Sequence, residues 1–292
     1  MSVLMTSYNR EKYIHQAIES VLASTYRNLE LVIVDDLSTD QTVEIARTYA
    51  MKDARVKIFL NEKNLGDYPN RNQAARHATG KYLKYVDADD YIYPWALEQM
   101  VSSMEKFPKA GWGLCSMEQD LARPFPFMLS PAEAYKYQYM GPGLFHRAPL
   151  SSIIRKDVFE QVGGFSPMRM VGDFEMWHRL AQRSPVVLMP QGMVWYRLHA
   201  EQELKSYRSF VEVYEQITLQ YLLDERCPLD KHEVEAALTS LKKIQRREIL
   251  KGITTFRIGR IVDGLKRLRQ HRKSGKTGMD PDGGSGTRRL AN

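Results

Sequence analysis

Short apolar runs alternate with helical stripes over the first hundred residues of the chain. Runs rich in β-branched and aromatic residues predict strands at 3–7, 29–34, 56–60 and 81–86. After the first run, Ile14, Ala17, Ile18, Val21 and Leu22 recur at the spacing of one buried helix face. Strands that alternate with helices in this way predict a parallel sheet with helices packed on it.

Local signals suggest where these helices begin and end. Residues 38–41 fit a capping box, so we expect a helix to start there. The segment 70–78 reads as a helix, with Gly80 as its C-terminal stop. Pro94 is well placed as the first residue of the following helix.

The periodicity fades between residues 119 and 150, where Pro, Tyr, Met and Gly dominate. This composition predicts a long loop with some helix, and long loops in compact domains are often functional. The segment is therefore either a binding site or lid, or a loop that is merely packed. Regular patterns return with an ordered segment at 151–155, helices at 157–162 and 173–183, strands at 186–189 and 194–198, and a helical region after 201.

Composition places the chain among globular proteins with a sizeable core, because 43% of its 292 residues are hydrophobic. The 2 cysteines, Cys115 and Cys227, lie far apart, which argues against a disulfide framework or a cysteine metal site. The first residues lack the pattern of a signal peptide, and no run is long enough for a membrane span. We therefore expect a cytoplasmic protein.

Positive charge is concentrated at the C-terminus. Residues 242–292 hold 15 Lys and Arg against 4 Asp and Glu, so the rest of the chain carries −4 of the total +7. A mildly acidic body argues against nucleic-acid binding. Residues 250–268 could form a basic amphipathic helix that contacts the inner face of the membrane, or a helix packed on the protein. We expect the Gly-rich tail 274–292 to be disordered.

The strand at 81–86 ends in a cluster of acids, Asp87, Asp89 and Asp90. Clustered carboxylates at the carboxyl edge of a sheet lie where open α/β folds bind ligands. They repel one another unless a positive group joins them, and Mg²⁺ or Mn²⁺ bridging to phosphate oxygens is a common solution. The alternative is a solvated Asp-rich turn.

An ordered set of short motifs resembles glycosyltransferase family 2. The matching segments are TSYN at 6–9, VIVDDLSTD at 32–40, NLG at 64–66, NQAA at 72–75, GKY at 80–82, VDADD at 86–90, VGGF at 162–165, DFEMW at 173–177 and YRLH at 196–199. The resemblance implies an α/β fold of the GT-A type, with a Rossmann-like, mostly parallel sheet flanked by helices and a helical C-terminal extension. It implies a catalytic domain at 1–202, made of a nucleotide-binding half at about 1–117 and an acceptor half at about 118–202. A basic helical extension at 203–273 and the tail at 274–292 would follow.

The resemblance also implies the roles of individual residues. The nucleotide would contact Thr6, Tyr8, Asn9, Asp35, Asp36, Arg71, Asp87, Ala88 and Arg197. Mn²⁺ or Mg²⁺ would be held by Asp89 and Asp87, with His199 joining when the site closes, and would stabilise the departing diphosphate. The structural alternatives are that Asp35 caps the Ser38 turn, that Arg71 is a salt-bridging residue and that His199 is structural.

Asp173 matches the catalytic base of the family's Glu-Asp motif, and the residue before it is Gly172 rather than Glu. One base opposite the leaving group is sufficient for an inverting transfer. Glu175 is the fallback base, and the alternative role for Asp173 is a helix N-cap.

The predicted function is an inverting, metal-dependent glycosyltransferase that uses a nucleoside diphosphate sugar, most simply a UDP-sugar. The acceptor would be a hydroxyl of a glycan or lipid-linked molecule, in surface polysaccharide synthesis by analogy. A nucleotidyltransferase is the second enzyme class, although it normally needs an N-terminal Gly-rich phosphate loop, which the sequence lacks. The third alternative is a degenerate, non-catalytic nucleotide-sugar-binding protein, which Gly172 favours.

Overall fold

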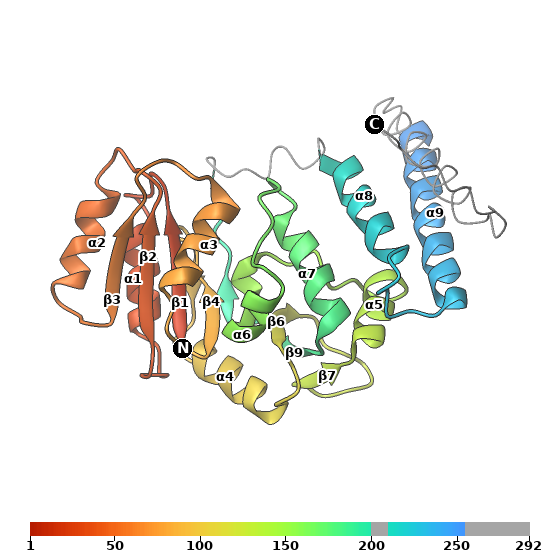
Figure 1. The fold of residues 1–292 in the computed structure, drawn as a ribbon, viewed down its shortest axis with the longest axis horizontal. Coiled ribbons are helices and arrows are strands. Elements are labelled where there is room, and N and C mark those ends of the chain that lie inside the picture. The colour runs from red at the N-terminus through yellow and green to blue at the C-terminus, as the bar shows by residue number, and fades with distance from the viewer. Residues whose placement is uncertain (200–209, 255–292) are drawn as a thin grey trace, which may run out of the picture.

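The computed structural model describes residues 1–199 and 210–254 (Figure 1). In this part of the chain, an eight-stranded sheet runs in the order β3-β2-β1-β4-β8-β6-β9-β7, and β5 pairs with β10 in a small second sheet. The strands are β1 Ser2–Ser7, β2 Glu30–Asp35, β3 Val56–Leu60, β4 Tyr82–Tyr85, β5 Tyr91–Ile92, β6 Trp112–Met117, β7 Phe127–Leu129, β8 Ser152–Arg155, β9 Val186–Pro190 and β10 Val194–Trp195. The helices are α1 Ile14–Leu22, α2 Thr42–Ala50, α3 Asp67–His77, α4 Ala96–Lys106, α5 Pro131–Tyr139, α6 Lys156–Gln161, α7 Gly172–Arg183, α8 Val211–Leu222 and α9 Lys231–Thr254.

The first half of the sheet is parallel, as the alternation of strands and helices predicts. β1 pairs in parallel with both β2 and β4, and β3 joins the outer side of β2. Ser7, the last residue of β1, lies opposite Asp35, the last residue of β2. The loops after these strands therefore meet at one edge of the sheet.

The second half makes the sheet mixed. β8 runs antiparallel to its neighbours β4 and β6, β6 and β9 are parallel, and β7 closes the edge antiparallel to β9. The sheet is continuous across the two expected halves of the catalytic domain, and helices flank it. This arrangement confirms the predicted fold class, including its helical C-terminal part.

Both faces of the sheet are buried. Alternate residues of β2 point to opposite faces, with Val32 and Val34 in one apolar cluster and Leu31 and Ile33 in the other. Helices α1, α2 and α4 cover the face of Leu31, whereas α3, α5, α6 and α7 cover the face of Val32. Burial on both faces explains why the strand reads as one continuous apolar run.

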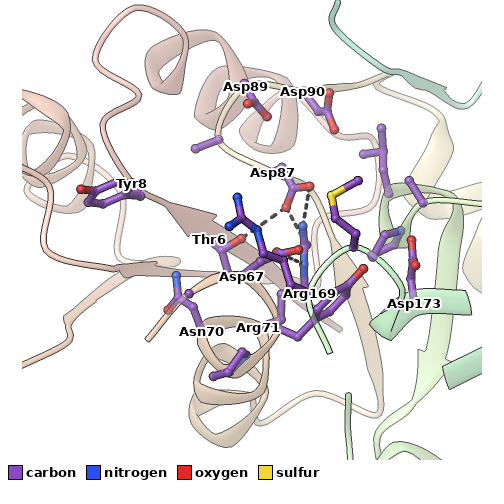
Figure 2. Close-up of a pocket in the computed structure, with 18 of the residues that line it drawn as sticks. Thr6, Tyr8, Asp67, Asn70, Arg71, Asp87, Asp89, Asp90, Arg169 and Asp173 are labelled. Atoms are coloured by element: carbon purple, nitrogen blue, oxygen red, sulfur yellow. Dashed lines mark hydrogen bonds and ion pairs between the residues drawn. The ribbon is translucent and has the colours of Figure 1, made fainter. Parts of the chain in front are cut away.

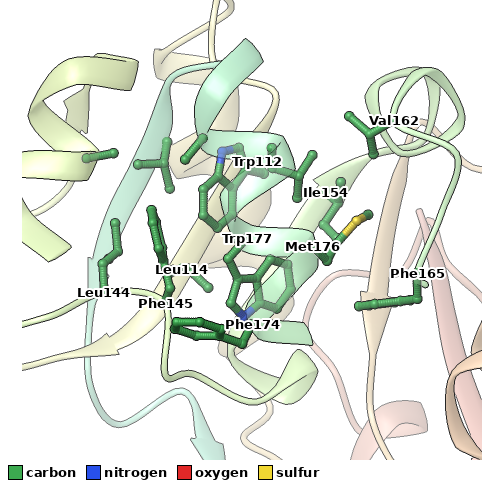
Figure 3. Packing of buried hydrophobic residues seen from close by; sticks show 14 of the residues in the cluster. Trp112, Leu114, Leu144, Phe145, Ile154, Val162, Phe165, Phe174, Met176 and Trp177 are labelled. Carbon is green, nitrogen blue, oxygen red and sulfur yellow. The ribbon is translucent and has the colours of Figure 1, made fainter. Parts of the chain in front are cut away.

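Trp177 and Trp195 differ in burial. Trp177 is fully buried and stacks on Trp112, with ring centroids 5.4 Å apart (Figure 3). Trp195 is 45% exposed and does not belong to the core. Its ring instead supports the Arg197 guanidinium, whose carbon lies 4.7 Å from the ring centroid.

Helix boundaries differ from those predicted because local hydrogen bonds decide them. α2 begins at Thr42, since the Ser38 hydroxyl donates to Asp35 (2.6 Å) instead of capping a helix. α3 begins three residues earlier than expected, at Asp67, and α4 begins at Ala96, two residues after Pro94.

Gly80 also has a different role from the predicted helix stop. α3 ends at His77, and Ala78 after it is already extended. A Cβ at Gly80 would lie 2.6 Å from the Met1 carbonyl carbon, so the glycine is required by close backbone approach.

The segment 119–150 has more regular structure than a long loop. It contains β7 and α5, and α5 begins with a complete capping box between Ser130 and Glu133. Before it, β6 was not predicted at all. At the other end of the domain, β10 is confined to Val194 and Trp195, shorter than the predicted strand.

The C-terminal helices α8 and α9 pack on the second half of the sheet domain beside α7 and α5 (Figure 1). Tyr221, Leu222 and Ala237 bury their side chains in the same apolar cluster as Trp177. The predicted basic helix at 250–268 overlaps the last residues of α9, which ends at Thr254, and the rest of it and the tail at 274–292 lie outside the described residues. Among the described helices, none has the length and apolar character needed to cross a membrane.

Candidate active site

A cavity of about 1270 Å³ opens at the carboxyl edge of the sheet, where the loops after β1, β2 and β4 meet (Figure 2). The second half of the domain closes it with the loop before α7 and with residues 145–151. The predicted site residues that line it are Thr6, Tyr8, Asp36, Arg71, Asp87, Ala88, Asp89 and Asp173. The structure therefore brings together acids that are far apart in the sequence.

Asp87 is held by a buried arginine. The Arg71 guanidinium donates two hydrogen bonds to the Asp87 carboxylate, at 2.6 and 2.8 Å, and a third to Asp67 at 2.8 Å. Thr6 donates a longer bond to Asp87, at 3.3 Å. The salt-bridging alternative for Arg71 is thus realised, and the same pair lines the cavity.

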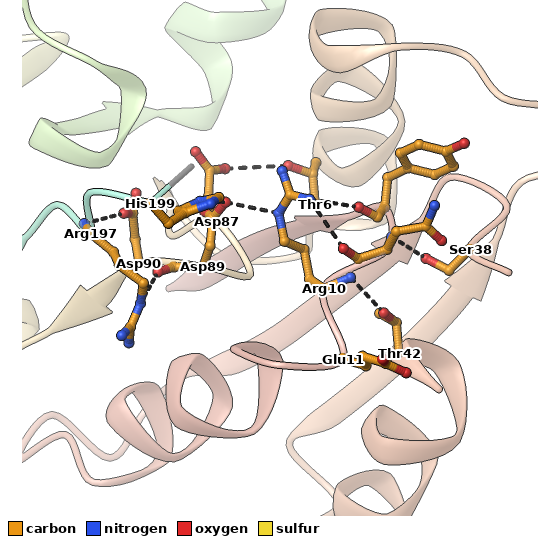
Figure 4. Close-up of polar contacts among 12 residues, drawn as sticks. Thr6, Arg10, Glu11, Ser38, Thr42, Asp87, Asp89, Asp90, Arg197 and His199 are labelled. Carbon is orange, nitrogen blue, oxygen red and sulfur yellow. Dashed lines mark hydrogen bonds and ion pairs between the residues drawn. The ribbon is translucent and has the colours of Figure 1, made fainter. Parts of the chain in front are cut away.

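Asp89 lies between two cationic or titratable side chains. Its Oδ2 atom is 2.8 Å from Arg10 Nε and 3.0 Å from His199 Nε2 (Figure 4). Arg197 donates from Nε to the Asp89 backbone carbonyl at 2.7 Å. The segment after β10 is therefore tied to the acidic loop.

Asp90 is buried and supports that attachment. Its carboxylate accepts the backbone N–H of Arg197 at 3.0 Å. Burial, with the negative charge of Asp87 nearby, raises the pKa of Asp90 well above its usual range. Asp90 therefore holds the segment after β10, through Arg197, and does not face open solvent.

The adjacent acids after β2 build the loops of the site. Asp35 accepts hydrogen bonds from Ser7 (2.8 Å) and from the backbone N–H of Ser38 (2.8 Å). It does not line the cavity, which is the capping alternative. Asp36 accepts from the backbone N–H groups of Leu65 and Gly66, both at 2.8 Å, and does line the cavity. It therefore holds the loop leading into α3.

Two residues predicted near the nucleotide have contrasting positions. Tyr8 is half-exposed on the cavity wall. Asn9 has a φ of 52° and accepts the backbone N–H of Thr39 at 2.9 Å, so it fixes the neighbouring loop. It lies outside the cavity lining, and neither it nor Asp35 is placed to touch a ligand there.

Asp173 stands at the start of α7 on the opposite side of the cavity from Tyr8 (Figure 2). It remains partly exposed, and one oxygen accepts the N–H of Phe174 at 2.7 Å. Burial raises the pKa of Asp173 to about 6, against a smaller opposing effect of hydrogen bonds from Phe174 and Tyr68. A carboxylate with this pKa is ionised at neutral pH and is a stronger base than an ordinary aspartate.

Glu175, the fallback candidate for the catalytic base, has surroundings that differ from those of Asp173. Arg179 donates two hydrogen bonds to its carboxylate, both at 2.7 Å, and the Tyr221 hydroxyl donates another. It is buried and lies outside the cavity lining. Glu175 joins α7 to α8, and the structure gives it no access to a substrate.

The acidic loop offers few side-chain ligands for a divalent cation. Within the described residues, no group of three or more His, Cys, Asp or Glu side chains is arranged to hold a metal ion. Mg²⁺ and Mn²⁺ need fewer protein ligands when substrate phosphates supply the rest. Asp89 Oδ2 and His199 Nε2 lie 3.0 Å apart in a hydrogen bond, close enough for both side chains to reach one small cation. This pair fits a metal, whereas both Asp87 oxygens are engaged by Arg71.

Several residues of the cavity escaped the sequence reasoning. Arg10 and Tyr68 carry no signal of their own, because they reach Asp89 and Asp173 only through the fold. Arg147 and Arg169 line the acceptor side of the cavity and come from segments without clear periodicity. Arg10 directly follows the TSYN motif, but nothing in the sequence links it to Asp89.

Comparison with known proteins identifies the family of the matched region. A family model described as "Glycosyl transferase family 2" matches residues 2–163, more than half of the chain. An uncharacterised glycosyltransferase of Haemophilus influenzae is 39% identical over 104 residues. That match covers 36% of this chain and 42% of the relative, which is less than half of the relative's own length.

Solved structures share the fold across almost the whole chain. Staphylococcus aureus TarS 1–349, in complex with UDP-GlcNAc, has a TM-score of 0.64 at 18% identity and covers 96% of this chain and 93% of that one. The mannosyltransferase PcManGT of Pyrobaculum calidifontis, in complex with GDP-Man and Mn²⁺, has a TM-score of 0.59 at 17% identity, covering 91% and 86%. Identities this low show a shared fold.

Proposed function

Since the chain belongs to glycosyltransferase family 2, we propose that it is an inverting, metal-dependent glycosyltransferase that uses a nucleoside diphosphate sugar. The observation that carries this proposal is one cavity with two chemically different walls. One wall holds Asp89 beside the arginines Arg10 and Arg71, with His199 bonded to Asp89 from outside the lining, and the other wall holds the partly exposed Asp173. A donor diphosphate suits the first wall and an acceptor hydroxyl suits the second.

The nucleotide would lie along the edge formed by the loops after β1 and β2. Thr6, Tyr8 and Asp36 line the cavity, as does Ala88. Asn9 and Asp35 would act from behind by fixing the loops. UDP is our first choice of nucleotide, supported by the UDP-GlcNAc complex of TarS, which shares the fold.

The diphosphate would meet the charges of the acidic loop. Asp89 and His199 would hold Mn²⁺ or Mg²⁺, with Asp87 nearby in its ion pair with Arg71. When bound, the metal supplies Lewis-acid stabilisation of the leaving diphosphate. Arg197, tied to the Asp89 carbonyl, would place its cation over the closed site, since arginine suits phosphate oxygens.

Asp173 would take the proton of the acceptor hydroxyl as that oxygen attacks the anomeric carbon of the sugar. The bond from that carbon to the diphosphate breaks at the same time, and the diphosphate leaves with the electron pair. A single displacement by one base inverts the configuration at the carbon. Glu175 has no part in this mechanism, because Arg179 and Tyr221 engage it.

The acceptor would be a glycan or a lipid-linked hydroxyl, entering beside the second half of the domain. We propose a role in surface polysaccharide synthesis, at the cytoplasmic side of the membrane, with the basic C-terminal stretch as the contact. Nucleic acid is not expected as a partner, because the body of the chain is mildly acidic.

The alternatives are weaker on the same observations. A nucleotidyltransferase would release pyrophosphate, and family membership gives it no support. A degenerate binding protein would need a lost base, whereas Asp173 lies on the cavity wall with a raised pKa.

The first experiment is calorimetric binding of UDP, GDP, dTDP and CDP, each with Mn²⁺ and again with EDTA. We expect one nucleotide to bind only with the metal. Asp89→Asn should abolish this metal-dependent binding. The matched control is Asp224→Asn, which removes an ion pair with Arg226 and should leave the binding unchanged. Absence of binding by all four nucleotides to folded protein would overturn the proposal.

A further inference from the structure

Gly172 stands where the family motif has a glutamate, and the structure shows what fills the space. A Cβ at Gly172 would lie 2.7 to 2.8 Å from three atoms of the Tyr68 ring. Side chains essentially never approach this closely, and the ring is enclosed, since Tyr68 is 4% exposed. The φ of Gly172 is not in the left-handed region, so backbone conformation does not require a glycine there. The space occupied by the Tyr68 ring does.

Tyr68 also reaches the next residue. Tyr68 and Asp173 line the same cavity, and hydrogen bonding by Tyr68 favours the ionised form of Asp173, which opposes the rise in its pKa that burial causes. Burial raises the pKa of Tyr68 itself well above its usual range, so the hydroxyl stays protonated and can donate. Tyr68 comes from α3, the helix that also supplies Arg71 to Asp87.

We propose that Tyr68 is a positioning residue for the catalytic base, and that Gly172 and Tyr68 together replace the missing glutamate of the motif. The phenol lies over the glycine and fixes the direction of the Asp173 carboxylate, leaving its other lone pairs for the acceptor hydroxyl. Gly172 is then a requirement of an intact site and not a sign of degeneration. This inference rests on the proposed role of Asp173 as base.

Other charged groups around Asp173 set the background for the test. Asp67 raises its pKa and Arg71 lowers it, both from α3. Arg169 and His146 line the same cavity from the second half of the domain. Tyr68→Phe leaves all four in place and keeps the ring over Gly172, so it removes the hydroxyl alone.

The test measures the Asp173 carboxyl directly, so that it does not depend on knowing the acceptor. The protein is labelled with ¹³C-carboxyl aspartate, and the Asp173 signal is identified by its loss in Asp173→Asn. A pH titration of the full chain then gives the pKa in the wild type and in Tyr68→Phe. We expect the pKa to rise above its wild-type value of about 6, because a bond that favours the charged form is lost.

Turnover is measured on the same proteins as release of nucleoside diphosphate from UDP-GlcNAc or GDP-mannose, whichever is consumed. In Tyr68→Phe, we expect kcat to fall by about tenfold with little change in donor KM, and its acid limb to move to higher pH. Tyr135→Phe is the matched control, since its buried hydroxyl bonds the His178 carbonyl away from the cavity. It should leave both the pKa and kcat unchanged.

Gly172→Ala provides the second arm. The added methyl must displace the Tyr68 ring, so the Asp173 pKa should rise as it does in Tyr68→Phe. Combined with Tyr68→Ala, the same substitution should have little further effect. An unchanged Asp173 pKa in both Tyr68→Phe and Gly172→Ala would overturn the inference. If Asp173→Asn remains fully active, the assignment of the base fails instead.

Discussion

At the scale of the residue, the site depends on two carboxylates that are treated in opposite ways. Asp87 is neutralised by the bidentate Arg71 pair, whereas Asp173 faces the cavity with hydrogen bonds from the neutral donors Phe174 and Tyr68. The first arrangement holds charge for the diphosphate end of a substrate. The second keeps a base of raised pKa where a hydroxyl can reach it.

The pH dependence of turnover should report the second arrangement. Burial raises the pKa of Asp173 to about 6, so the base is active above that pH and becomes protonated below it. We therefore expect kcat to fall tenfold per pH unit on the acid side of about pH 6. Asp173→Asn should lower kcat by about 10²–10⁴-fold at pH 7.5.

The control for this profile is Glu175→Gln, whose carboxylate lies outside the cavity. Provided that the variant is folded, its acid limb should stay where it is in the wild type. An acid limb near pH 4 in the wild type would assign the base to an ordinary, exposed carboxylate.

At the scale of the element, the sequence predicted the strands and helices whose position is set by their own apolar pattern. β1 to β4 and α1, α6 and α7 were found close to their bounds, because each buries a continuous run or a regular stripe. β6 was missed since Gly113, Cys115 and Ser116 weaken its strand pattern, and its pairing with β8 and β9 defines it. The capping box of α5, by contrast, was a readable signal inside a segment taken for a loop.

The candidate site shows the same division. Asp87 and Asp89 could be named because the strand before them ends at the sheet edge, and Asp173 could be named because it matches a family motif. Arg10 could not, since its bond to Asp89 joins residues 79 positions apart. Tyr68 lies over a hundred positions from the base that it contacts, and no local pattern reports such a contact.

Glu30, at the start of β2, should be a measurable stabiliser of the parallel half. Burial alone would raise its pKa, but hydrogen bonds from Lys57, Ser2 and Thr79 outweigh this effect and lower the pKa to about 2. Because the folded pKa is depressed, the stabilisation is present above about pH 4.5 and is lost as the pH falls toward 2. Glu30→Gln should lower the free energy of unfolding by about 2–3 kcal/mol at pH 7.

Urea unfolding of both proteins from pH 7 to pH 3 would measure this difference. We expect the two curves to converge as the pH falls. Glu105→Gln is the control, because its ion pair with Lys81 is exposed and should contribute less than about 1 kcal/mol. If the difference in free energy of unfolding were the same at all pH values, Glu30 would stabilise the fold through packing and not through its charge.

At the scale of the whole molecule, one sheet joins the two expected halves of the domain. β4 contributes to the parallel half, and its edge pairs directly with β8 of the second half, including Leu83 with Ile154. Ile154 is fully buried in the cluster that also holds Leu4, Val32 and residues of α7 and α8. The halves therefore share both backbone pairing and core.

This continuity predicts a single unfolding transition. Ile154→Ala removes buried methyl groups and should lower the free energy of unfolding by about 2–5 kcal/mol. Scanning calorimetry should show one peak that moves as a whole to lower temperature. Leu121→Ala is the control, since Leu121 is 98% exposed. Two separate peaks, of which one alone moves, would establish two independent domains.

The close contact between Gly172 and the Tyr68 ring has a consequence for how such a site can change over generations. A larger residue at position 172 meets the ring at 2.7 Å, so it is tolerated only after position 68 has become smaller. The reverse order passes through a protein whose base is displaced. Substitutions at the two positions must therefore occur in a fixed order. A chain with the Glu-Asp pair can arise from this chain only if position 68 changes before position 172.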